Sequence, residues 1–138
     1  MSRKAAREKA MQLMYQMQVN DDFDKSNKDI FYEENKITGD EIKYIDNCID
    51  TISENKDDID NIVKNYAKGW KLERISTVDL SILRIAIYEI MFREDIPIEV
   101  SINEAVEIAK TYSSLEAGKF INGILGTFVR DKYNHESK

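Results

Sequence analysis

The sequence predicts an all-α protein of about seven helices. Its 138 residues are 42% hydrophobic, which is enough to bury a core at this length. One proline and five glycines are too few for the turns of a β-sandwich or barrel. Apolar residues recur at helical spacing along most of the chain. We therefore expect one compact helical domain, or at most two small subdomains that share a core.

The first helix is expected over residues 3–19, where apolar residues form a stripe: Ala6, Ala10, Leu13, Met14 and Met17. Arg3 and Arg7 are four residues apart, so they should project from one side of its N-terminal end. Cations there oppose the helix dipole, which favours anions. Cations at this unfavourable end of a helix are typical of a site where function overrides stability. A bound phosphate could contact both arginines and the free backbone amides of the first turn.

Three helices are expected between residues 20 and 66. Residues 20–38 have the weakest pattern and are the likeliest to vary in length; a short helix over 23–34 would be anchored by Phe31 or Tyr32. Residues 38–41 fit a capping box that opens a helix over 39–54, with four isoleucines inward: Ile42, Ile45, Ile49 and Ile52. Residues 57–66 predict a short fourth helix.

The most apolar segment follows a second capping box, residues 76–79. Its length of about 17 residues and the interspersed Arg84 and Glu89 favour a helix over a strand. A helix that is apolar nearly all round is central and buried. Pro97 prevents its continuation.

Two further helices complete the chain. Residues 101–104 fit a third capping box, which Glu104 would complete, followed by a helix of about twelve residues. Residues 113–116 can cap the last helix, where Asn122 and Gly123 are poor helix formers. Gly123 suggests close packing of another backbone, and Asn122 could hydrogen-bond to a neighbouring helix end. The polar tail from Asn134 is expected to fray.

Several classes of chemistry are disfavoured. Cys48 is the only cysteine, so no intramolecular disulfide can form; we expect a buried, inert thiol and a reducing, cytoplasmic location. We expect no signal peptide, because residues 3–9 lead into an amphipathic stretch, and no membrane span, because no apolar run reaches about 18 residues. His135, the only histidine, lies in the tail, and neither zinc ligands nor a Gly-rich phosphate loop occur. We expect a binding protein without cofactor or metal, and not an enzyme.

The charge is unevenly distributed. The net charge is −6, but residues 1–20 carry four basic residues against one acidic residue. Residues 21–66 carry fourteen acidic residues against six basic ones. A polyanion would therefore be repelled by the acidic segment and attracted to the first helix. On spacing alone, solvated surface charge explains Arg3, Lys4 and Arg7 as well as phosphate contact does.

Two aromatic residues have structural interpretations. Trp70, between two helices, is expected to close part of the core. Tyr15 is more typical of a half-buried packing residue than of a base-stacking platform.

Four ordered segments of the chain resemble the NusB family. The resemblance spans the chain except residues 20–38 and the tail. The segments are residues 2–10 (SRKAAREKA) with Leu13 and Tyr15; 70–79 (WKLERISTVD) running into 82–89 (ILRIAIYE); 96–97 (IP) with 100–110 (VSINEAVEIAK); and 119–125 (KFINGIL).

The resemblance implies an all-α fold of two small helical bundles packed together, with subdomains at approximately 1–66 and 67–138. It implies transcription antitermination, notably of ribosomal RNA operons, within the transcription elongation complex. Its implied partners are NusE, a small-subunit ribosomal protein, and single-stranded boxA RNA in nascent transcripts. Family members occur as monomers and homodimers, so a homodimer is possible here.

The resemblance also implies functional residues, by their positions in the matching segments. Arg3, Lys4 and Arg7 match the basic RNA-contacting segment. Tyr15 and Asp79 match positions on the NusE-facing surface, and Arg74 lies nearby. The family often has a denser arginine run, which alanines 5 and 6 thin out here, so RNA binding without NusE is expected to be weak. The acidic midsection could face the basic ribosomal protein and speed its association.

Three other functions compete with this one. The domain also resembles the N-terminal RNA-binding module of some RNA cytosine methyltransferases, but 138 residues hold no methyltransferase region. A helical protein–protein adaptor without direct RNA binding remains the main alternative. A hydrolase that uses clustered acids lacks a convergent site in the sequence.

Overall fold

A computed structural model describes residues 3–133 of the chain. This part contains seven α-helices, one 3-10 helix (η1) and no strand, which confirms the all-α prediction. The elements are α1 (Arg3–Val19), α2 (Asn27–Asn35), α3 (Asp40–Glu54), α4 (Lys56–Tyr66), η1 (Leu72–Arg74), α5 (Thr77–Phe92), α6 (Ile98–Tyr112) and α7 (Leu115–Lys132). The expectations for the tail from Asn134, and for His135, lie outside the described residues. Within residues 3–133, none of the helices has the length and apolar character needed to span a membrane.

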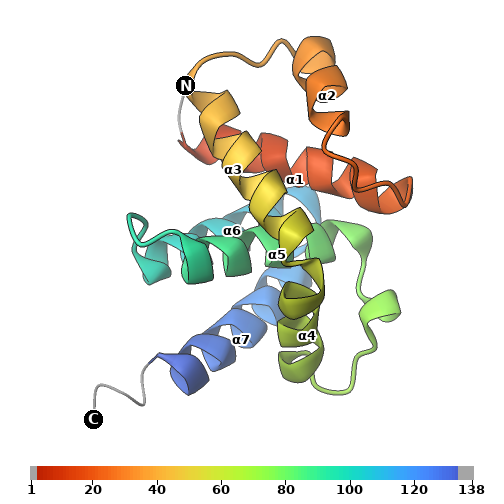
Figure 1. Ribbon diagram of the computed structural model, residues 1–138. Coiled ribbons are helices and arrows are strands. Elements are labelled where there is room, and N and C mark those ends of the chain that lie inside the picture. The colour runs from red at the N-terminus through yellow and green to blue at the C-terminus, as the bar shows by residue number, and fades with distance from the viewer. Residues whose placement is uncertain (1–2, 134–138) are drawn as a thin grey trace.

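Helix α5 is the centre of the fold, as Figure 1 shows. It packs against α1, α3, α4, α6 and α7, and every residue from 81 to 90 is buried. The prediction of a central helix is therefore confirmed. Because α5 is surrounded on all sides, it has no solvent-facing stripe and its sequence is apolar nearly all round.

The other helices group around the two sides of α5. Helix α1 packs on α3 and α5, and α2 covers α1. Helices α6 and α7, joined through residues 113–114, pack closely on each other. Helix α4 contacts α5 and α7 more than α3, so it groups with the C-terminal helices, although a boundary near residue 66 would assign it to the N-terminal half. All seven helices contribute to one continuous hydrophobic core, and the division into subdomains stays a prediction.

The buried carboxylate of Glu89 joins four helices. Arg7 Nε of α1 lies 2.7 Å from Glu89 Oε2, and Arg7 Nη2 lies 3.2 Å from Oε1. Tyr44 of α3 donates to Oε2, and Ser101 of α6 donates to Oε1 at 2.7 Å. Burial opposes the charge on Arg7, but hydrogen bonding and attraction to Glu89 outweigh it, and the pKa of Arg7 is raised.

The expectation that Arg7 projects from the surface beside Arg3 is wrong. Arg7 is only 6% exposed, and its guanidinium points into the core. The physical reason is Glu89, which is 1% exposed and needs a cation to compensate its burial. Sequence spacing could not show this, because Glu89 lies 82 residues away along the chain.

A second buried ion pair explains the other polar residue of α5. Arg84 Nε and Nη2 donate to the two carboxylate oxygens of Asp60 at 2.8 and 2.9 Å. Arg84 Nη1 donates to Gln18 of α1 at 2.8 Å, and Lys56 Nζ lies 3.4 Å from Asp60 Oδ2. This bidentate pair fixes α4 against α5 and the end of α1.

Two predicted helix caps are confirmed. Ser76 Oγ accepts from the backbone N–H of Asp79 at 3.1 Å at the start of α5. Ser114 Oγ accepts from the backbone N–H of Ala117 at 3.0 Å at the start of α7. Both serines satisfy amides that have no partner within their helix.

Two other predicted caps are wrong. The N-cap of α3 is Gly39, at φ 68°, with no side-chain capping bond. Helix α6 begins at Ile98, directly after Pro97, so Ser101 lies inside the helix and serves Glu89. Glu104 lies 3.7 Å from Arg7 Nη1 and completes no capping box. Proline before the first helical residue starts α6 earlier than the serine pattern predicts.

The second helix is shorter and later than predicted. It spans Asn27–Asn35, and Phe31 is its buried anchor, whereas Tyr32 is half-buried and donates to Asp46 of α3 at 2.6 Å. Lys28 Nζ lies 2.7 Å from Asp50 and 3.2 Å from Asp46. These polar contacts, which the sequence pattern does not show, attach α2 to α3.

We expect Arg7→Ala to lower the free energy of unfolding by about 3–5 kcal/mol, because it leaves the Glu89 carboxylate buried without its cation. Urea unfolding measures the change. Lys4→Ala is the matched control, since Lys4 is exposed on the same helix, and it should change stability by less than about 0.5 kcal/mol. Equal effects of the two substitutions would contradict a structural role for Arg7.

The expectation that another backbone packs closely at Gly123 is wrong, because a Cβ at this exposed position would have nothing within 4 Å. Gly123→Ala should therefore raise stability by about 0.5–1 kcal/mol through helix propensity and a less flexible unfolded chain. Gly118→Ala should gain less, since its Cβ would lie 3.1 Å from Lys110 Cγ. Thermal unfolding compares them, and a destabilised Gly123→Ala protein would refute this.

Candidate nucleic-acid interface and partner surface

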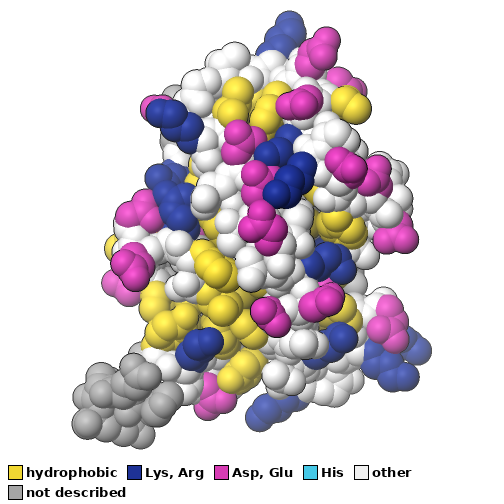
Figure 2. All heavy atoms as spheres, viewed as in Figure 1, with side chains coloured by type: hydrophobic (Ala, Val, Ile, Leu, Met, Phe, Trp, Pro, Cys, Tyr) yellow, Lys and Arg dark blue, Asp and Glu magenta, His cyan; other side chains and the backbone are white. Residues whose placement is uncertain are grey.

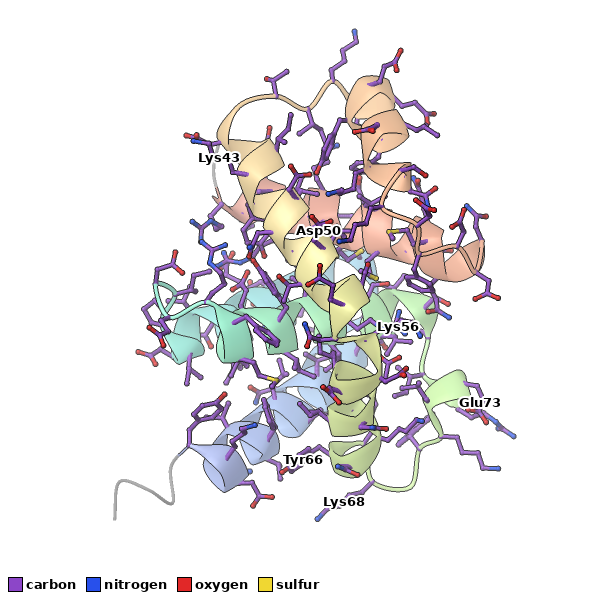
Figure 3. All side chains as sticks on the ribbon, viewed as in Figure 1. Lys43, Asp50, Lys56, Tyr66, Lys68 and Glu73 are labelled. Carbon is purple, nitrogen blue, oxygen red and sulfur yellow. The ribbon has the colours of Figure 1, made fainter. Side chains whose placement is uncertain are left out.

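A cleft of about 650 Å³ lies where the start of α1, the start of α3 and the end of α5 meet; we call it the α1–α3–α5 cleft. Figure 3 labels Lys43 at this edge, where its side chain projects outward, and Figure 2 shows further Lys and Arg side chains along the same edge. The lining residues are Arg3, Ala6, Asp40, Glu41, Lys43, Tyr44, Asn47, Phe92 and Arg93.

Three cations converge on this cleft, Arg3 from α1, Lys43 from α3 and Arg93 from the position directly after α5. The guanidinium carbons of Arg3 and Arg93 lie 5.3 and 5.8 Å from the centre of the Tyr44 ring, close enough for cation–π attraction. The side chain of Lys43 is 84% exposed. Although the whole chain is acidic, this part of its surface can attract a polyanion.

Arg93 is held in place and Arg3 is not. Arg93 Nε and Nη2 donate to the carboxylate of Asp95 at 2.8 and 2.7 Å. These hydrogen bonds lower the pKa of Asp95 to about 2. Among residues 3–133, no carboxylate lies within salt-bridge distance of Arg3. Arg93 is thus paired directly with a carboxylate, whereas Arg3 has only a longer-range attraction to Asp95 and remains available to a ligand.

The three residues predicted to contact RNA separate in the structure. Arg3 lines the cleft, and Lys4 is exposed next to it on α1. Arg7 is buried against Glu89, so its guanidinium does not face a phosphate. Sequence reasoning missed Lys43 and Arg93, which no local motif marks and which join the cleft only through folding.

A second hollow, of about 430 Å³, lies between η1 and the start of α7; we call it the η1–α7 pocket. Arg74 and Asp79, both predicted to face a partner, line it together with Trp70 and Phe120. The Trp70 and Phe120 rings meet edge to face at 5.7 Å. The expectation that Trp70 closes the core is wrong. It is 54% exposed, because it lies in the α4–α5 connection outside the helix bundle, where its ring packs against that of Phe120.

Tyr15 lies in a neighbouring groove of about 320 Å³, lined by residues of α1, the start of α5 and the end of α6. Val78 of this groove adjoins Asp79 of the pocket, so the two hollows form one surface. We call it the aromatic surface; its exposed members are Tyr15, Trp70, Arg74 and Tyr112. Large apolar side chains gathered at the surface are typical of a protein interface.

The two surfaces lie at different places on the molecule. Figure 3 labels Lys43 beside the cleft and Glu73 on η1 at opposite edges of the view. Helix α1 links them, since Arg3 and Tyr15 are twelve residues apart on it, about 18 Å along the helix axis. One molecule therefore has room for two ligands at once.

The remaining chemistry is sparse. Residues 3–133 contain no group of three or more side chains placed to hold a metal ion. Cys48 is fully buried, as expected, and burial raises the pKa of its thiol well above the usual value. A protonated, inaccessible thiol is a poor nucleophile.

The chain is similar to known proteins over nearly its whole length. A family model described as the NusB family matches residues 4–130. The transcription antitermination protein NusB of Acetivibrio thermocellus is 46% identical over 132 residues, which cover 96% of this chain and 91% of that protein. The protein of the same name from Finegoldia magna is 43% identical, with coverage of 97% and 98%.

Solved structures share the fold. T. maritima NusB superposes with a TM-score of 0.86 at 35% identity, covering 99% of this chain and 96% of that one. A chain in the crystal structure of antitermination factors NusB and NusE in complex with dsRNA has a TM-score of 0.85 at 25% identity, with coverage of 94% and 96%. The superposed parts thus cover nearly the whole fold on which the cleft and the aromatic surface lie.

Proposed function

Because the chain belongs to the NusB family, we propose that it is a transcription antitermination factor that pairs with NusE and binds boxA RNA in nascent transcripts, notably of ribosomal RNA operons. It acts as a binding protein and not as an enzyme, within the transcription elongation complex of the cytoplasm. The observation that carries this proposal is the presence of two separate exposed surfaces, one cationic and one aromatic, on this fold.

The cationic cleft is the proposed RNA site. Arg3 and Lys4 would contact phosphates of single-stranded RNA, since long flexible cations neutralise a backbone without reading its sequence. Lys43, exposed at the start of α3, joins them from a second helix. Arg7 contributes indirectly, because its buried pair with Glu89 holds the first turns of α1 in position.

The aromatic surface is the proposed NusE site. Tyr15 and Trp70 offer large, half-exposed rings of the kind that anchor protein interfaces. Arg74 and Asp79 flank Trp70 and offer opposite charges for hydrogen bonding. Oδ1 of Asp79 is buried without a hydrogen-bond partner in the described part of the chain, so a donor from the partner would relieve an existing cost.

A protein–protein adaptor without direct RNA binding is the second candidate. It is favoured by the aromatic surface and by the net charge of −6. In an adaptor, the cationic cleft would not bind RNA, and this is the one difference from the main proposal.

We expect Arg3→Ala/Lys4→Ala to weaken binding of boxA RNA, measured by fluorescence anisotropy with and without NusE. Two lost phosphate contacts should also reduce the slope of log affinity against log salt by about 1.4, or about 0.7 per contact for a single strand. Lys64→Ala/Lys132→Ala removes the same charge from exposed positions on α4 and α7 and is the control.

Equal RNA affinity of the two double variants would overturn the RNA site while leaving the family assignment intact. If the protein binds NusE but binds no RNA, either by itself or with NusE present, the adaptor would be favoured. Failure of wild-type protein to bind either partner would overturn the proposed function.

We expect Tyr15→Ala and Trp70→Ala each to weaken NusE binding by about tenfold or more, because each removes a large ring from the interface. Titration calorimetry with purified NusE measures this. Ile30→Ala is the control, since Ile30 is 59% exposed on α2, outside the aromatic surface. Unchanged affinity in both aromatic variants, or an equal loss in the control, would place NusE elsewhere.

A further inference from the structure

The α1–α3–α5 cleft contains more than a phosphate site requires. Phe92, at the end of α5, is 42% exposed beside the cations. Glu41, from the first turn of α3, also lines the cleft but is only 4% exposed. Oxygen Oε2 of Glu41 is buried and has no hydrogen-bond partner in the described part of the chain.

An unpartnered carboxylate is unexpected at a site that only binds phosphate. It repels an anion, and a buried acceptor without a donor lowers stability. An ionised carboxylate can only accept hydrogen bonds, so its natural ligand is an N–H donor. Phosphates offer none, whereas the edges of nucleobases do.

The bases differ in what they offer to a carboxylate. Cytosine presents an amino group at C4, and guanine and adenine also carry exocyclic amino groups. Uracil is nearly the same shape as cytosine but has a carbonyl oxygen at C4. Its N3–H donor lies between two carbonyl oxygens, which the carboxylate would repel. A carboxylate in the cleft would therefore favour amino-bearing bases over uracil.

The other lining groups suit the rest of a nucleotide. An exposed ring such as that of Phe92 can stack on any base, as in many single-strand binding proteins. Arg3 has no carboxylate within salt-bridge distance in the described part of the chain, and Lys43 has only the exposed Asp40 at 3.8 Å, so both can hold the flanking phosphates. The volume of about 650 Å³ lies within the range of small-ligand sites.

We propose that the α1–α3–α5 cleft reads one base of single-stranded RNA, with Glu41 accepting from an exocyclic amino group and Phe92 stacking on the ring. This inference rests on the proposed binding of boxA RNA and assigns part of its base selectivity to two residues of the cleft. Arg93, which is paired with Asp95, lies with Arg3 near the Tyr44 ring that lines the cleft.

The test compares oligocytidine and oligouridine 12-mers, which differ at C4 of every base, using the full-length protein with NusE present. The wild-type protein should bind oligocytidine about tenfold more tightly. Glu41→Gln should bring the affinity ratio near one, because an amide offers both an acceptor and a donor. A purely structural role for Glu41 would instead weaken both RNAs equally and keep the ratio.

Two variants serve as controls. Asp40→Asn removes the neighbouring exposed charge of the cleft and should keep the ratio, since its side chain is 93% exposed and lies beside Lys43. Phe92→Ala should weaken both RNAs by about fivefold or more through lost stacking, and also keep the ratio.

The outcomes separate this proposal from the broader one. A wild-type ratio near one, with both RNAs bound, would overturn base reading and leave RNA binding standing. A ratio that Glu41→Gln does not change would remove Glu41 from the site. Absence of binding to either RNA with NusE present would overturn both proposals.

Discussion

The hydrogen-bonded carboxylate of Glu89 is the contact on which the arrangement of the helices depends. A charge buried this deeply is tolerated only with a cation and further donors around it. Arg7, Tyr44 and Ser101 supply these from α1, α3 and α6. Because hydrogen bonds are short and directional, this cluster sets the relative placement of four helices more sharply than apolar contacts alone.

Both proposed surfaces follow from how α1 and α5 cross. Arg7 near the start of α1 meets Glu89 near the end of α5, and Gln18 near the end of α1 meets Arg84 in the middle of α5. The two helices therefore run in roughly opposite directions. One end of the pair forms the cationic cleft with α3, and the other contributes Tyr15 and Asp79 to the aromatic surface. The buried ion pairs thus position binding residues that they do not touch.

Local charge, and not net charge, governs what the protein can bind. The acidic residues concentrate in α2, α3 and α4, where some are occupied by internal partners such as Lys28 and Arg84. The cations of the cleft come from α1, the start of α3 and the end of α5, so only folding makes them neighbours. A field focused on one edge can attract RNA to a protein whose net charge is −6.

The sequence by itself determined the features that repeat along a helix. Apolar periodicity predicted the helices, the nearly uniform apolar character of α5 predicted its burial, and Ser76 and Ser114 were recognisable as caps. Four sequence segments also indicated the family. These signals are local, because a helix turn is built from residues three or four positions apart.

Only the tertiary structure decided where the long side chains go. Arg3 and Arg7 are four residues apart on the same side of α1, yet Arg3 is exposed and Arg7 is buried. Trp70 lies outside because the chain around η1 leaves the bundle, and Arg93 joins the cleft from the far end of α5. A flexible side chain adopts the direction of its partner, and here the partners lie tens of residues away in the sequence. No local pattern contains that information, so the binding residues became clear only once the helices were packed.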